Sequence, residues 1–130
     1  MRFSSLGDVV LTTPIPRLLK KKYPNSEIHF ITKKIYSSIY NNNINVDKVI
    51  EFSNNLLKTY KDLKKENYDL VIDLHSNLRS IFLKFLLFRK TYTYNKEFIR
   101  RWIYVNTKID LKIKHISTSY IETLKKLGIE

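Results

Sequence analysis

The chain has 130 residues and no cysteine. That length suits one domain with a buried core, and the composition excludes a disulfide framework or a thiolate metal site. It shows neither a run of about 18 apolar residues that would cross a membrane nor a basic and then apolar N-terminus typical of a secretory signal. The net charge of +12, from 24 basic and 12 acidic residues, indicates an anionic partner unless the lysines only solvate helix faces.

Residues 2–14 place a glycine and a carboxylate where a strand is expected to pass into a helix. Gly7 lets the backbone turn tightly and lets a ligand come close, because it has no Cβ. Asp8 is expected at the start of the helix, with its side chain facing the crevice above a sheet, or else as a simple helix cap. Pro14 and Pro16 then indicate either a kink or a new helix that Thr13 caps, with both prolines in its first turn.

Strands and helices alternate along the rest of the chain. Short segments rich in β-branched or aromatic residues predict strands at 27–32, 46–52, 70–72 and 90–94. Helical spacing places Leu56, Leu57, Tyr60 and Leu63 on one face, and likewise Leu78, Ile81, Phe82, Phe85 and Leu86. A last helix, about 116–127, stops at Gly128. This alternation predicts an α/β fold with a doubly wound parallel sheet.

Three blocks of sequence resemble the lipopolysaccharide heptosyltransferases, which form glycosyltransferase family 9. The first is an S-x-x-G-D turn followed by T-x-P, carried by Ser4, Gly7, Asp8, Thr12 and Pro14. The second is a Y-D-x-x-x-D strand with a polar, basic turn, from Tyr68 and Asp69 through Asp73 to Asn77, Arg79 and Ser80. A looser third block is Tyr94, Asn95 and Lys96 with Arg100 and Arg101.

The resemblance implies a Rossmann-like domain over residues 1–130, the N-terminal, acceptor-side half of a two-domain GT-B enzyme. Only three residues precede the Ser-Ser-Leu-Gly-Asp turn, so we expect the first strand to be truncated. The resemblance also implies that the second, donor-binding domain is absent, that this chain is an incomplete piece, and that alone it is inactive.

The reaction implied by the resemblance is an inverting sugar transfer. Asp8 would act as the general base that takes the proton of an acceptor hydroxyl. The donor would be a nucleotide sugar, ADP-heptose, held mainly by the other domain, and no further cofactor is expected. The acceptor would be an acidic, lipid-linked lipopolysaccharide inner core at the cytoplasmic face of the inner membrane, where peripheral membrane contact is also expected. Nucleic acid is not among the expected partners.

The candidate substrate-binding residues are Ser4, Gly7, Thr12, Asn77, Arg79, Lys96 and Arg100. Arg79 is the best candidate to hold an acidic acceptor, because a guanidinium grips a carboxylate or phosphate with two hydrogen bonds. In the alternative interpretation, Asn77 caps a helix, Arg79 is solvated, and the threonine and serine hydroxyls satisfy backbone groups. No pair of histidines has metal-ligand spacing, so no metal site is assigned.

Other functions fit less of the chain. Asp73 ends an apolar strand as the phospho-acceptor of a receiver domain does, but Asp8 has no acidic neighbour to complete that site. A P-loop motif is absent, and two glycines cannot make a G-x-G-x-x-G loop. The cluster of Lys96, Arg100, Arg101, Trp102 and Tyr104 fits sugar stacking, membrane contact, nucleic acid or a helix that faces the core. The main alternative is a non-catalytic basic module, or an inactive remnant, that binds an anionic glycan or a membrane surface.

Overall fold

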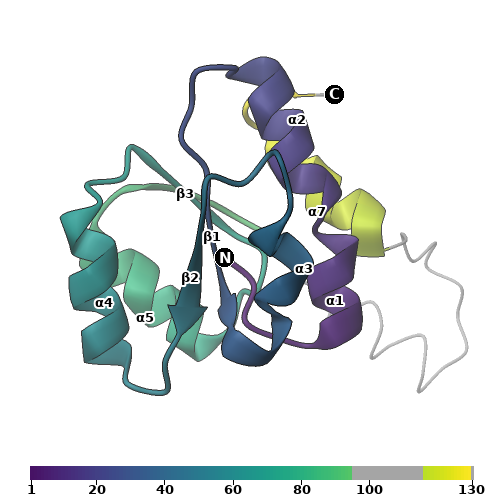
Figure 1. Ribbon diagram of the computed structural model, residues 1–130. Coiled ribbons are helices and arrows are strands. Elements are labelled where there is room, and N and C mark those ends of the chain that lie inside the picture. Colours follow the sequence, from purple (N-terminus) through teal and green to yellow (C-terminus); the bar gives the residue numbers. More distant parts are fainter. Residues whose placement is uncertain (95–115, 130) are drawn as a thin grey trace, which may run out of the picture.

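A computed structural model describes residues 1–94 and 116–129 of the chain (Figure 1). Its elements alternate as predicted. In chain order they are α1 (Leu6–Leu11), α2 (Pro14–Lys22), β1 (His29–Lys33), the 3-10 helix η1 (Lys34–Tyr36), α3 (Ser38–Asn41), β2 (Lys48–Phe52), α4 (Leu56–Lys65), β3 (Leu70–Asp73), α5 (Leu78–Leu87), β4 (Lys90–Thr93) and α7 (Ile116–Lys125).

The strands are parallel and form two pairs, which residues 1–3 connect through backbone hydrogen bonds. β1 pairs with β2, and β3 pairs with β4. Between these pairs, the Arg2 N–H donates to the Ile31 carbonyl at 3.1 Å and the Leu74 N–H donates to the Met1 carbonyl at 3.0 Å. Residues 1–3 therefore occupy the central strand position, in the order β2, β1, residues 1–3, β3, β4. The predicted doubly wound parallel sheet is confirmed.

Helices cover both faces of this sheet (Figure 1). α4 and α5 lie on one side, whereas α1, α2, α3 and α7 lie on the other. Because side chains alternate along a strand, each face has its own core. Under α4 and α5 the buried residues are Phe3, Ile31, Phe52, Leu63 and Leu83. On the opposite face there are two clusters, one of Ile15, Leu74, Tyr94, Tyr120, Leu124 and Ile129 and one of Val9, Phe30 and Tyr40.

Helix α1 ends at Leu11, and a new helix, α2, begins at Pro14. Of the two expected arrangements for the prolines, the new helix is therefore correct, and Pro14 and Pro16 lie in its first turn. Thr13 takes the N-cap position but does not cap with its side chain, because its hydroxyl donates back to the Val10 carbonyl at 2.8 Å. At the other end of the chain, Gly128 follows α7 with a φ of 68°, as a terminating glycine should.

α5 is turned differently from the way its apolar spacing suggested. Ser80 and Leu83 are fully buried, whereas Ile81, Phe82 and Phe85 are exposed. The cause lies at the start of the helix, where the Ser80 hydroxyl donates to the buried Asp73 carboxylate at 2.9 Å. That bond turns the side of α5 that carries Ser80 toward the core. The apolar residues that helical spacing placed on one face, among them Ile81, Phe82 and Phe85, therefore point to solvent.

No helix in the described part of the chain is long and apolar enough to cross a membrane.

Candidate functional site

Asp8 lies in the first turn of α1, beside the C-terminal end of the central strand segment. It is the third helical residue, and Ser5 holds the N-cap position. The Asp8 carboxylate accepts hydrogen bonds from the Ser5 hydroxyl at 2.9 Å and from the Ser5 N–H at 3.4 Å. Its side chain remains 26% exposed. Asp8 is thus tied to the helix start while one side of its carboxylate can still meet a ligand.

Arg2 is the residue that fixes Asp8 against the sheet. One guanidinium nitrogen lies 2.5 Å from Asp8 Oδ2 and the other donates to the Leu74 carbonyl at 2.8 Å. The Arg2 side chain is only 8% exposed, and a buried guanidinium needs an anionic partner. The pair therefore joins the central segment, α1 and the end of β3 at the point where the strand order reverses, which is where open α/β sheets bind ligands.

Tyr120 of α7 closes the other side of this cluster. Its hydroxyl donates to Asp8 Oδ1 at 3.4 Å, and the Arg2 guanidinium lies 5.8 Å from the centre of its ring. Burial is the main reason that the pKa of Tyr120 rises to about 12. The phenol therefore stays neutral and remains a hydrogen-bond donor at physiological pH.

The surroundings of Asp8 favour its charged form. Partial burial raises the pKa of the Asp8 carboxyl. The Ser5 hydroxyl and the Arg2 guanidinium lower it by more, so the pKa lies below the ordinary value. A carboxylate with a low pKa is ionised and ready to accept a proton, although it is a weak base. Such a base can act in a reaction in which the proton moves late, after the new bond has begun to form.

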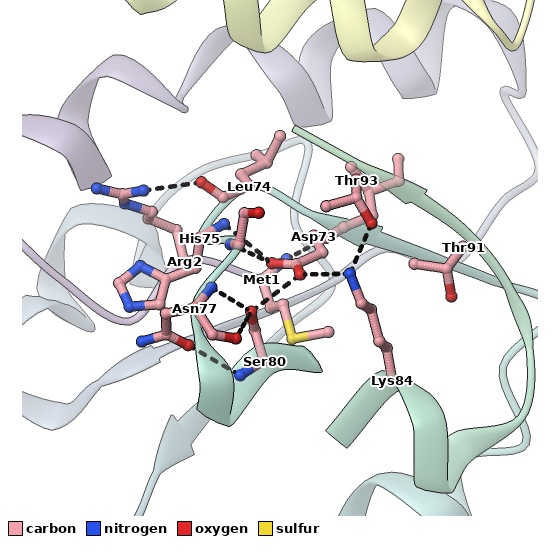
Figure 2. Close-up of polar contacts among 12 residues, drawn as sticks. Met1, Arg2, Asp73, Leu74, His75, Asn77, Ser80, Lys84, Thr91 and Thr93 are labelled. Carbon is pink, nitrogen blue, oxygen red and sulfur yellow. Dashed lines mark hydrogen bonds and ion pairs between the residues drawn. The ribbon is translucent and has the colours of Figure 1, made fainter. Parts of the chain in front are cut away.

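A second polar cluster centres on Asp73, at the end of β3 (Figure 2). The Asp73 side chain is completely buried and lies 3.2 Å from the Lys84 ammonium, which in turn donates to the Thr93 hydroxyl at 2.8 Å. The backbone N–H groups of His75 and Ser76 also donate to Asp73, at 3.0 and 2.9 Å. Burial would raise the pKa of Asp73, but these backbone bonds and the Ser80 hydroxyl bring it below the ordinary value.

This network shapes the turn that follows β3. Ser76 adopts a φ of 50°, an uncommon conformation for a residue with a side chain, and the bond from its N–H to Asp73 holds it there. His75 is buried with its ring 5.0 Å from that of Phe3. A carboxylate that is fully buried and bonded on both oxygens cannot accept a phosphoryl group from outside, so Asp73 does not form a receiver-type site.

Of the three substrate-binding residues predicted in the first block, Gly7 and Thr12 have surroundings different from those expected. Gly7 lies inside α1 without a positive φ, so the tight turn predicted for it was wrong, although a Cβ there would meet no atom within 4 Å. Thr12 is buried, and its hydroxyl bonds to the Val9 carbonyl at 2.6 Å and to the Tyr40 hydroxyl at 2.7 Å. This packing role does not match the expected substrate contact. Ser4 is half-buried just before the N-cap.

The site residues predicted after β3 lie at the start of α5. Asn77 caps this helix, because its side chain accepts the Ser80 N–H at 2.9 Å. Arg79 is exposed in the first turn, which leaves its guanidinium open to a ligand. Both positions also agree with the alternative interpretation of a capped helix and a solvated arginine. Lys96 and Arg100, with the rest of the basic and aromatic cluster, lie outside the described residues.

Sequence reasoning missed Arg2 and Tyr120. Arg2 could have been found, because an arginine inside an apolar strand segment, six residues before an aspartate, indicates an ion pair. Nothing local indicated Tyr120, which is 112 residues from Asp8 in the chain. Within residues 1–94 and 116–129 no group of three or more histidine, aspartate or glutamate side chains could hold a metal ion.

Comparisons with known proteins agree with this geometry. No family model matches the chain. It is 33% identical over 78 residues to lipopolysaccharide heptosyltransferase 3 of Escherichia coli K12, covering 52% of this chain and 23% of that protein. It is 24% identical over 106 residues to lipopolysaccharide heptosyltransferase 1 of Campylobacter coli, covering 77% of this chain and 31% of that protein.

A solved structure gives the same result for the fold. The glycosyl transferase family 9 protein of Veillonella parvula matches with a TM-score of 0.77 and 25% identity, over 98% of this chain and 40% of that chain. The chain therefore spans less than half of each of these relatives.

The parallel sheet, with Asp8 at its carboxyl edge, is an α/β fold similar to that of the family 9 glycosyl transferase structure. The chain is thus similar in sequence to lipopolysaccharide heptosyltransferases and in fold to a glycosyltransferase family 9 structure, which is the resemblance that its motifs predicted.

Proposed function

We propose that this chain forms the acceptor-side domain of a GT-B glycosyltransferase in which Asp8 is the general base. The observation that carries the proposal is the Asp8 carboxylate, ionised by Arg2 and Ser5 yet partly exposed at the carboxyl edge of the sheet. In the transfer, Asp8 takes the proton of the acceptor hydroxyl while the hydroxyl oxygen attacks the anomeric carbon. The bond from that carbon to the diphosphate breaks, and the nucleoside diphosphate leaves with the bonding electrons.

The names of the relatives supply the substrates of the proposal. Both curated relatives are lipopolysaccharide heptosyltransferases, so we infer a nucleotide-activated heptose as donor and an acidic, lipid-linked inner-core oligosaccharide as acceptor. Arg79 would hold an acidic group of that acceptor, with Ser4 nearer the reacting hydroxyl. The donor would be bound mainly by a part of the relatives that this chain does not cover. We place the reaction in the cytoplasm, at the inner face of the membrane.

The test is transfer in a chimera that joins residues 1–130 to the donor-binding half of a family 9 enzyme. We expect Asp8→Asn, assayed at a temperature at which the variant remains folded, to lower kcat by about 10²–10⁴-fold with little change in the KM for the acceptor, because the proton acceptor is lost. Asp62→Asn is the control, since this carboxylate lies on the exposed surface of α4. Near-normal turnover by the Asp8→Asn chimera would refute the role of Asp8 and leave a non-catalytic binding module as the function.

A further inference from the structure

α5 is apolar on two opposite sides. Its inner side packs Leu83 and Leu87 into the core beneath the helix. Its outer side carries large apolar residues that are exposed, and we call these the α5 outer face: Leu78, Ile81, Phe82, Phe85 and Phe88. A surface helix normally carries polar residues on its solvent side, and clustered exposed apolar side chains mark an interaction site.

Phe88 gives a second reason to regard this face as functional. It follows the helix in a left-handed conformation, with φ 48° and ψ 48°, which is uncommon for a bulky residue and is usually taken by glycine. Its side chain is 91% exposed, so packing does little to offset the strain. Fold stability therefore does not account for a phenylalanine at this position.

The charge that the α5 segment itself carries is entirely positive. From Leu74 to Thr93 the chain contains no aspartate or glutamate. Of its basic residues, Lys84 is paired with Asp73. Arg79, Arg89 and Lys90 are exposed at the two ends of the face, and Arg89 also donates to the Asn67 side chain. A second copy of this chain would bring like charges together. An anionic lipid surface would accept the apolar side chains at its acyl boundary and the cations among its headgroups.

We propose that the α5 outer face binds the surface of an anionic membrane. The proposal deepens the proposed function, on which it rests for its purpose, since that function has a lipid-linked acceptor. Asn77 and Arg79, the candidate acceptor residues, occupy the cap and first turn of the same helix. Docking through α5 would therefore hold the acceptor crevice next to the membrane surface from which the acceptor projects.

The experiment is flotation of purified residues 1–130 with vesicles, without donor or acceptor. We expect the protein to float with vesicles of phosphatidylethanolamine and phosphatidylglycerol and much less with phosphatidylcholine alone. Added salt should weaken this binding, because exposed charges are screened over about 8 Å at physiological ionic strength.

Two pairs of variants separate apolar insertion from attraction of charge. Phe85→Gln with Phe88→Gly should reduce binding at least about tenfold, and glycine at position 88 should preserve thermal stability by removing the left-handed strain. Ile35→Gln with Ile44→Gln is the matched control, since both residues are exposed apolar side chains outside α5. Arg89→Gln with Lys90→Gln should weaken binding and its salt dependence, unlike Lys21→Gln with Lys22→Gln on α2.

Three results would overturn the proposal. One is no flotation of the wild-type chain with anionic vesicles, and another is equal binding by the Phe85 and Phe88 double variant. The third is lipid-independent self-association that the same double variant abolishes, because it would assign the face to a second copy. None of these results bears on Asp8, whose role is read from transfer in the chimera.

Discussion

At the scale of single residues, the ion pair between Arg2 and Asp8 shapes the candidate site. Asparagine would be a nearly neutral replacement if Asp8 were the N-cap residue, but that position belongs to Ser5. Asp8 instead neutralises a guanidinium that is only 8% exposed. Removing the charge of Asp8 leaves Arg2 buried without an anion, which is the costly way to break such a pair.

We therefore predict that Asp8→Asn destabilises residues 1–130 by about 1–3 kcal/mol, discounted from a fully buried pair because Asp8 is partly exposed. Arg2→Met should also destabilise the fold, whereas the double variant should lose less than the sum of the two. Urea unfolding of all four proteins gives the coupling free energy, which we expect to exceed about 1 kcal/mol. Additive losses would show that the two side chains do not stabilise one another.

At the scale of elements, Asp73 joins β3 to α5 and, through Lys84, to β4. The Asp73 carboxylate receives the N–H groups of the turn after β3 and the ammonium of Lys84 (Figure 2). This one buried group fixes the turn and the rotation of α5. The rotation decides which residues form the core and which form the α5 outer face.

Acid should weaken this link. The pKa of Asp73 is lower in the folded chain than its ordinary value, so the folded state binds fewer protons than the unfolded state in acid. The stabilisation is therefore fully present above the unfolded pKa, about 4, and is lost as pH falls through the folded pKa. Asp73→Asn should be less stable at pH 7 and lose less further stability as pH falls from about 5 into the range below the unfolded pKa of about 4.

Urea midpoints measured across that range check this prediction. Asp69→Asn is the control, because Asp69 is exposed. A parallel loss of stability with falling pH in wild type and Asp73→Asn would contradict the role given to Asp73, although Asp8 also has a lowered pKa and contributes part of the wild-type loss.

At the scale of the whole molecule, the proposed acceptor site at Asp8 belongs to a strongly basic chain. A net charge of +12 attracts acidic ligands from a distance, and the carboxyl edge of the sheet is where we propose that they bind. The matched structure is more than twice as long as this chain, since the chain covers 40% of it. The proposed donor site belongs to that additional part.

Accordingly, purified residues 1–130 should transfer no sugar from a nucleotide-heptose donor to a deacylated inner-core acceptor. They should still bind the acceptor weakly, with an affinity that falls as salt screens the exposed charges over about 8 Å at physiological ionic strength. Mass spectrometry of the acceptor measures transfer, and a nuclear magnetic resonance titration at low and high salt measures binding. Turnover by the isolated chain would refute the proposal that the donor site lies outside residues 1–130.

The sequence by itself determined the succession of elements, the parallel sheet and the ends of several helices. Proline at the start of α2, glycine after α7 and uninterrupted apolar residues in β3 act locally, through backbone geometry and hydrogen bonding that neighbours in the chain already specify. For the same reason the S-x-x-G-D turn, with its carboxylate beside a helix start, could be recognised in advance.

Only the tertiary structure decided how those elements use their side chains. Thr12 matched a motif but is buried against Tyr40, and Asp8 meets Arg2 and Tyr120. The rotation of α5 depends on a buried carboxylate at the end of β3. The contacts of Thr12 with Tyr40 and of Asp8 with Tyr120 join residues far apart in the chain. The free energy of all these contacts depends on burial that exists only after the sheet and helices have packed.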